Sequence, residues 1–143
     1  MKILVLNGPN INMVGIREKS IYGSESFDDI IRMVEAHAKE NGIEVKCLQS
    51  NHEGDLVDWI QSAWFEKYDG IVMNPGAYTH TSIAIADAVK AIAPIPVIEV
   101  HISDINSREE FRHISYAAPY CLDQIKGHGI HGYLEAIDEL AAK

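Results

Sequence analysis

The sequence predicts a single α/β domain, a five-stranded parallel sheet with helices on both faces. Short apolar runs of strand length alternate along the chain with segments whose apolar residues recur at helical spacing. Parallel strands need right-handed crossover connections, which carry helices to the two faces of the sheet. The chain has 143 residues, of which 47% are apolar, and this suits one domain with one sizeable core.

The first predicted elements are a strand, a helix and a second strand. The apolar run at residues 3–6 stops at a cluster of turn-forming residues, which indicates a buried strand that leads into a loop. Ser26 and Asp29 resemble a capping box, and the helix that follows ends at Gly42. Residues 44–49 alternate imperfectly, as expected of a strand that is open to solvent on one side.

The middle of the chain predicts two helices around the third strand. Asp55 is expected to cap the first of these helices. Its apolar stripe consists of Leu56, Trp59, Ile60, Ala63 and Trp64. Residues 70–73 are expected to form the third strand, and the next helix is expected to extend from Ser82 to about Ile92.

The last part of the chain completes the sheet. Residues 97–100 form the fourth strand, and Ser107 with Glu110 is expected to cap a short helix. Residues 123–126 form a weak, polar strand that fits the edge of a sheet. The last helix is expected to bury Ile130, Tyr133, Leu134, Ile137 and Leu140. A flavodoxin-like strand order best accommodates these elements.

The loop after the first strand is long and rich in polar side chains. It contains Asn10, Asn12, Arg17 and Tyr22, groups that can position a water, bind an anion or exchange a proton. Loops of this length in a compact domain are usually functional lids or disordered segments. A lid above the carboxyl end of a central strand would cover the place where open α/β sheets bind ligands, although a polar surface loop is an equal alternative.

In the predicted fold, the loops after the first, third and fourth strands converge on one crevice. The second of these loops contributes Asn74 and His80. The third begins with Glu99 and His101, which lie two residues apart and so point to the same face of a strand. A carboxylate beside an imidazole orients the ring and favours its protonated form, which suits a general acid. The alternative is a salt bridge at the edge of the sheet.

The charge of the chain limits its partners. The formal net charge of −9 opposes binding to nucleic acid or to an anionic membrane, so any anion site must depend on local arginines. Cys47 and Cys121 lie far apart, and no secretory h-region or membrane-spanning run is found. We therefore expect a cytoplasmic protein.

Other motifs predict no cofactor. Gly127, Gly129 and Gly132 match GxGxxG, but they follow the weakest strand and no complete βαβ unit with a ribose-binding carboxylate accompanies them. His128 and His131 occur without an HExxH motif or a cysteine pattern, so a metal site is not expected. The sequence also has no GxSxG or Walker A motif.

Four blocks of the chain resemble the type II 3-dehydroquinate dehydratases in order and spacing: LVLNGPNINMVGIREKSIYG, NPGAYTHTSIAIADA, EVHISDINSREEFRH and GYLEAI. The resemblance covers nearly the whole chain. It implies a shikimate-pathway enzyme that converts 3-dehydroquinate to 3-dehydroshikimate without metal or cofactor, as one catalytic domain (residues 1–143) in a homododecamer built from four trimers. Asn106 and the strand DQIK depart from the family pattern, and we expect neither to touch a position that the family uses for chemistry.

The resemblance also implies catalytic roles. Tyr22 would be the base that removes a proton beside the ketone, and Arg17 would favour its phenolate; one charge at about 4 Å is worth about 4 kcal/mol at an effective dielectric of 20. A water held near Asn12 would stabilise the enolate. His101, oriented by Glu99, would protonate the departing hydroxyl.

A further set of residues is implied to bind the carboxylate and hydroxyls of the substrate. These are Asn74, His80, Asp87, Arg112 and the amides of Ile102 and Ser103. Residues 18–20 would close as a lid, and Asn10 would be structural. The helix around Asp87 is apolar on all sides, so we expect one side to pack on a neighbouring subunit and to bring Asp87 into its crevice.

A non-catalytic flavodoxin-like module that binds a flavin or a small anion is the alternative function. It would need an apolar or aromatic platform and would have no use for a set of Tyr, Arg, Glu and His side chains. The colour of the purified protein and an assay for the enone product distinguish the two.

Overall fold

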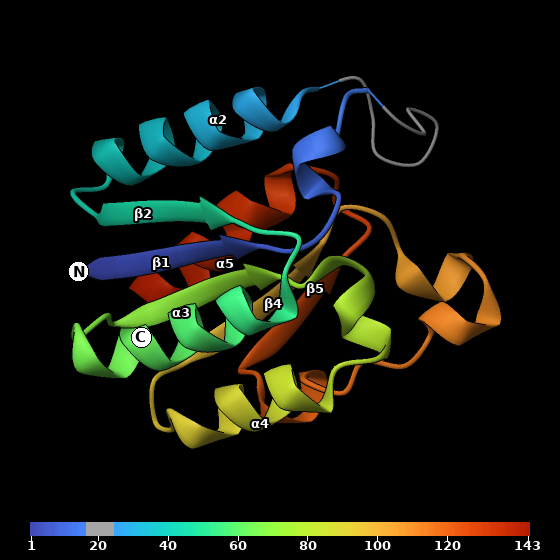
Figure 1. Cartoon of the computed structure of the whole chain (residues 1–143). Helices are drawn as coiled ribbons and strands as arrows, with labels where there is room; N and C mark the ends of the chain where they lie inside the picture. Colours follow the sequence, from blue (N-terminus) through green and yellow to red (C-terminus); the bar gives the residue numbers. More distant parts are fainter. Residues whose placement is uncertain (17–24) are drawn as a thin grey trace.

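The computed structural model describes residues 1–16 and 25–143. Its centre is a parallel sheet with the strand order β2-β1-β3-β4-β5 (Figure 1). The strands are β1 Lys2–Asn7, β2 Glu44–Gln49, β3 Gly70–Asn74, β4 Val97–His101 and β5 Asp123–Lys126. The helices are α2 Phe27–Glu40, α3 Glu53–Phe65, α4 Ile83–Ala91 and α5 His131–Ala141. The flavodoxin-like order and the five predicted strands are confirmed.

Two apolar cores cover the two faces of the sheet. Alternate residues of β1 point to opposite faces, so Ile3 and Val5 pack in one core whereas Leu4 and Leu6 pack in the other. Helices α2 and α5 cover the first face, and α3 and α4 cover the second (Figure 1). Helices therefore lie on both faces, as predicted. Strands β2 and β5 form the edges and are the more exposed strands.

Of the predicted helix caps, Ser26 is confirmed, whereas Asp55 and Ser107 are wrong. Ser26 caps α2 in a complete capping box, and Ser82 caps α4. Helix α3 begins at Glu53, so Asp55 lies in its first turn rather than in front of it. The Asp55 carboxylate instead accepts a hydrogen bond from the Ser50 hydroxyl at 2.6 Å. This contact ties α3 to the residue that follows β2.

The short helix predicted from Ser107 and Glu110 is also wrong. Two separate 3-10 turns occupy this region, η3 Ile105–Ser107 and η4 Glu110–Arg112. Asp104 caps the first turn, because its carboxylate accepts a hydrogen bond from the Asn106 amide at 3.0 Å. Trp64 also departs from the predicted stripe of α3, since its side chain lies at the surface and is 52% exposed.

The sheet brings three loops to one edge. Asn7 pairs with Asn74, and Met73 pairs with Glu99, so β1, β3 and β4 end close together and their loops begin side by side. The first two loops touch because of a glycine: a Cβ atom on Gly8 would lie 2.4 Å from the Pro75 carbonyl oxygen. These loops contain η1 Ile11–Met13 and η2 Gly76–His80.

Candidate active site

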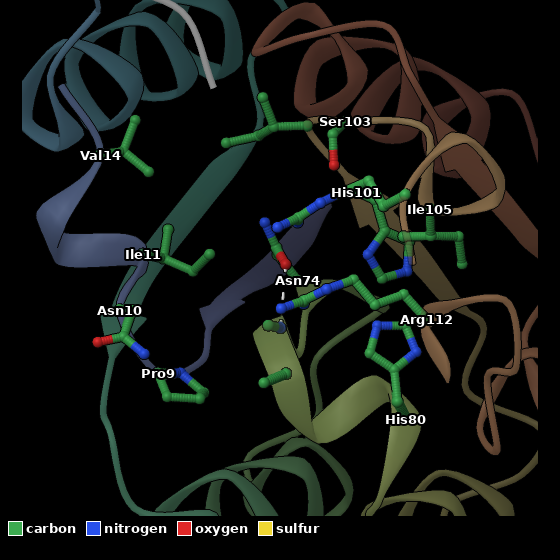
Figure 2. A pocket seen from close by; sticks show the side chains of 14 residues that line it. Pro9, Asn10, Ile11, Val14, Asn74, His80, His101, Ser103, Ile105 and Arg112 are labelled. Carbon is green, nitrogen blue, oxygen red and sulfur yellow. Dashed lines mark hydrogen bonds between the residues drawn. The ribbon is translucent and has the colours of Figure 1, made fainter. Parts of the chain in front are cut away.

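The loops after β1, β3 and β4 line a pocket at the carboxyl ends of the strands (Figure 2). Figure 2 shows Pro9, Asn10 and Ile11 on one side of it, with His80 and Arg112 among the side chains on the other side. The lining residues are Pro9, Asn10, Ile11, Val14, Asn74, Gly76, Ala77, His80, His101, Ile102, Ser103, Ile105, Arg108 and Arg112. The predicted convergence of the three loops is therefore confirmed.

The structure brings most of the predicted site residues to this pocket. Six of them line it: Asn74, His80, His101, Ile102, Ser103 and Arg112. Asn12 is exposed beside the pocket and accepts a hydrogen bond from Gln49 at 3.3 Å. Asp87 is exposed on α4 and does not line the pocket of its own chain. Arg17, Tyr22 and the predicted lid at residues 18–20 lie outside the described residues.

Glu99 and His101 form a buried pair at the end of β4. Their side chains are 0% and 6% exposed, and Nε2 of His101 lies 3.5 Å from Oε1 of Glu99. Nε2 has no hydrogen-bond partner among the described residues, so the contact with Glu99 becomes an ion pair when the imidazole is protonated. The Glu99 carboxylate accepts hydrogen bonds from Ser115 and Gln124, each at 2.7 Å. The predicted common direction of the two side chains is confirmed, and the pair lies inside the fold rather than at a sheet edge.

The pKa of Glu99 reflects this environment. Burial alone would raise the pKa, but the adjacent His101 and the hydrogen bonds from Ser115 and Gln124 outweigh burial and lower the pKa below its ordinary value. Glu99 is therefore a carboxylate throughout the neutral range. An ionised, buried carboxylate beside an imidazole orients the ring and stabilises a positive charge on it, which suits proton donation.

The His80 ring is held by a hydrogen bond to the loop that contains Ile114. Its Nδ1 lies 2.8 Å from the Ile114 carbonyl oxygen, an arrangement in which Nδ1–H donates and Nε2 of the neutral ring can accept. Burial lowers the pKa of His80, and the positive charges of His101 and Arg112 add to this effect, which the bond to Ile114 opposes. His80 is thus a neutral hydrogen-bonding group near pH 7.

Asn74 is fixed by a buried network that the sequence analysis did not identify. Its Nδ2 donates to the Tyr133 hydroxyl at 2.9 Å, and that hydroxyl donates to Oδ1 of Asn7 at 2.6 Å. Its Oδ1 accepts a hydrogen bond from the Gly76 amide at 3.1 Å. Burial raises the pKa of Tyr133, so the phenol stays neutral. The signal for this network was a tyrosine among the buried positions of the last helix, because a buried hydroxyl needs partners.

Two further pocket residues were missed or assigned differently. Arg108 lines the pocket with Arg112, and the two arginines form the local cationic patch that a chain of net charge −9 needs for an anion. The sequence feature that could have identified Arg108 is its position four residues before Arg112, in the loop that follows Glu99 and His101. Asn10, expected to be structural, also lines the pocket, and its backbone is left-handed with φ of 69°.

Two patterns noted in the sequence concern metal ions and dinucleotides. Among residues 1–16 and 25–143, no group of three or more His, Cys, Asp and Glu side chains is arranged to hold a metal ion. Gly132 of the GxGxxG motif packs against the side chains of Val100 and Ile125, so it serves the contact between α5 and the sheet.

Comparisons with known proteins agree on one family. The model of the family described as Dehydroquinase class II matches residues 1–141. A 3-dehydroquinate dehydratase of Clostridium perfringens (strain ATCC 13124) is 55% identical over 143 residues, which cover 100% of this chain and 99% of that relative. The crystal structure of a type II dehydroquinase from Butyrivibrio crossotus DSM 2876 superposes with a TM-score of 0.98 at 57% identity and covers 99% of this chain and 97% of that one. The type II dehydroquinase from Propionibacterium acnes gives 0.94 at 41% identity, with the same coverage.

Proposed function

Since this chain belongs to the class II dehydroquinase family, we propose how its pocket carries out the family's reaction. The chain is a hydro-lyase of the shikimate pathway that acts on 3-dehydroquinate. Elimination of water from this substrate gives 3-dehydroshikimate. The family resemblance noted in the sequence is confirmed by these matches, and the assignment of residues to steps is our proposal.

The first step is removal of a proton from the carbon beside the ketone. Tyr22 is the base in this proposal, and Arg17 favours its phenolate; both lie outside the described residues. Asn12 holds a water that stabilises the enolate oxygen, since developing charge is best stabilised by donors already in place. The exposed Asn12 beside the pocket, joined to Gln49, supports this role.

The second step is departure of the hydroxyl, which needs a proton. His101 donates it while the Glu99 carboxylate balances the charge of the ring. The single observation that carries the proposal is this pair: a buried ionised carboxylate 3.5 Å from an imidazole that lines the pocket. A structural salt bridge would not need its imidazole to line a pocket together with two arginines.

The remaining residues hold the substrate. Asn74 and the amides of Ile102 and Ser103 hydrogen-bond its polar groups, and His80 and Arg112 contact its hydroxyls and carboxylate. Arg112 is oriented by a 2.6 Å contact from its Nε to Oε2 of Glu109. Residues 18–20 close over the bound substrate in this proposal.

We also propose a homododecamer built from four trimers, in which Asp87 reaches the pocket of a neighbouring subunit. Support comes from the outer side of α4, where Ile83, Ala84 and Ala91 are exposed beside Asp87 although they are apolar. No helix in the part of the chain that the structure describes is long and apolar enough to cross a membrane. A cytoplasmic location is proposed because Cys47 and Cys121 form no disulfide.

The assignment of Tyr22 as the base is tested by Tyr22→Phe, which removes only the ionisable oxygen. We expect turnover to fall by at least about 100-fold with little change in substrate affinity, measured by formation of the enone product and by substrate binding. Tyr120→Phe, a change outside the pocket, is the control and should keep normal turnover. A near-normal turnover number for Tyr22→Phe would exclude Tyr22 as the base.

A further inference from the structure

The buried carboxylate of Glu99 has two hydrogen-bond donors that the mechanism above leaves without a role. Ser115 Oγ donates to Oε1 at 2.7 Å, and Gln124 Nε2 donates to Oε2 at 2.7 Å. Glu99 is 0% exposed, so water does not take the place of either donor. A carboxylate in such surroundings keeps its charge only if hydrogen bonds and a nearby cation compensate for the lost water.

Strand register explains why residue 124 is polar. Gln124 on β5 pairs with Glu99 on β4, and paired residues of neighbouring parallel strands point to the same face. The next residue, Ile125, points to the other face and packs in the apolar core. A side chain at position 124 must therefore lie against Glu99. Gln124 therefore contacts Glu99, a residue to which the resemblance assigns a role, whereas the polar strand at residues 123–126 was expected to touch no such position.

Ser115 is a donor of fixed direction. Its Oγ accepts a hydrogen bond from the Ala118 amide at 3.1 Å, and the single hydrogen of the hydroxyl is directed to Glu99. The hydroxyl thus cannot donate elsewhere without losing its bond to Glu99. Ser115 and Gln124 together give each oxygen of the Glu99 carboxylate one hydrogen-bond donor.

We propose that Gln124 and Ser115 are positioning residues for His101: they clamp the Glu99 carboxylate so that Oε1 faces Nε2 of the imidazole. The inference rests on the proposed role of His101 as the proton donor and deepens it. Neither residue lines the pocket, so each acts on the reaction only through Glu99 and His101.

The clamp has a consequence for the dependence of activity on pH. Besides His101, the described titratable and charged groups near this pair include His80, Arg112 and Arg108, which line the same pocket, and Lys126, which pairs with His101 in the sheet. The Cys121 thiol also lies nearby, and its burial and the charge of Glu99 keep it protonated. Burial raises the pKa of Glu99, and loss of a donor leaves this effect less opposed, so the carboxyl becomes protonated at a higher pH. A protonated Glu99 no longer stabilises charge on His101, and activity should be lost earlier as the pH falls.

The test compares steady-state kinetics of Gln124→Met and Ser115→Ala with the wild type between pH 5 and 9. We expect kcat to fall about 10-fold at neutral pH, a part of the 10²–10⁴-fold that a general acid contributes, with KM changed by less than about 2-fold. The acid limb of kcat should move to higher pH. Ser115→Thr keeps the hydroxyl and should restore kcat, and Ser62→Ala, which removes a hydroxyl from α3 far from the pair, is the matched control.

A double-mutant cycle separates positioning from a general loss of structure. In a His101→Gln background, Gln124→Met should lower kcat by less than about 2-fold, because the group through which it acts is gone. Equal losses in both backgrounds, or a normal kcat and pH profile for Ser115→Ala and Gln124→Met, would overturn the proposal. If Gln124→Met does not fold, the contrast between Ser115→Ala and Ser115→Thr decides. An inactive wild type, or a fully active His101→Gln, would instead reject the proposed function itself.

Discussion

A single buried hydroxyl, that of Tyr133, holds two asparagines from neighbouring strands. It accepts a hydrogen bond from Asn74 and donates one to Asn7, and all three side chains are buried. Oδ1 of Asn74 also accepts a hydrogen bond from the Gly76 amide, so the orientation of the Asn74 side chain is fixed before any substrate binds. Preorganisation of this kind lowers the entropy lost on binding.

Tyr133→Phe removes this hydroxyl and leaves Nδ2 of Asn74 and Oδ1 of Asn7 without their partner. We expect the free energy of unfolding to fall by about 1–3 kcal/mol, the cost of unsatisfied buried polar groups, and KM to rise because Asn74 is no longer held. Urea unfolding and steady-state kinetics measure the two effects.

Tyr78→Phe is the control for this prediction. The Tyr78 hydroxyl donates to the Asn51 carbonyl at 2.8 Å in an exposed position, where water can replace it. Its loss should cost less than that of Tyr133. Equal stability losses in the two variants, with KM unchanged in Tyr133→Phe, would contradict the assigned network.

Helix α2 begins directly after the segment that contains the proposed base. The Phe27 amide donates to the Val14 carbonyl at 3.2 Å, so the described residues on the two sides of this segment are joined. The capping box of Ser26 and Asp29 satisfies amides that the helix leaves free at this point. The start of α2 is therefore joined to the described residues that precede this segment.

Ser26→Ala removes the side chain that caps α2. We expect a loss of about 1 kcal/mol in the free energy of unfolding, the usual cost of removing such a cap. Ser107→Ala is the matched comparison: its hydroxyl only donates to the Asp104 carbonyl in an exposed turn, and its loss should cost less than about 0.5 kcal/mol. Urea unfolding of both variants measures the difference. If Ser107→Ala lost more stability than Ser26→Ala, the Ser107 hydroxyl would matter more than its single contact with Asp104 indicates, and the prediction would fail.

The outer surface of α3 and α4 is unusually apolar for a single chain. Ile83 is 60% exposed, and Trp64 and Phe65 are exposed next to Ala91, where they line a shallow hollow. Large exposed apolar side chains of this kind mark a contact surface. Copies with a net charge of −9 repel one another at long range, so apolar contact is the term that must favour assembly.

The proposed dodecamer predicts that two inactive variants restore activity to each other. Tyr22→Phe retains Asp87, and Asp87→Ala retains Tyr22, so joint dissociation and reassembly should form some pockets that contain both native groups. Light scattering should show a particle with twelve times the mass of one chain. Full activity of Asp87→Ala alone, or a mixed assembly that stays as inactive as its parents, would reject the shared pocket.

Some features of the site were predicted correctly from residues close together in the sequence. Glu99 and His101 point to one face because they lie two residues apart on a strand. Asn74 and His80 reach the pocket because their loop follows a central strand. Asp55 and Ser107 were assigned wrongly as caps, because Asp and Ser side chains can bond either to a helix start or to a nearby turn, and the sequence does not distinguish the two.

By itself the sequence determined the strands, the helices, their order and the loops that meet, since these depend on apolar periodicity and turn chemistry along short stretches of chain. Only the tertiary structure decided which distant residues share a hydrogen bond. Gln124 bonds Glu99 across 25 positions, Tyr133 bonds Asn74 across 59, and it bonds Asn7 across 126. Such partners are selected by strand register and by the way α5 crosses the sheet, because a buried polar group must bond to whatever donor or acceptor the packing places beside it.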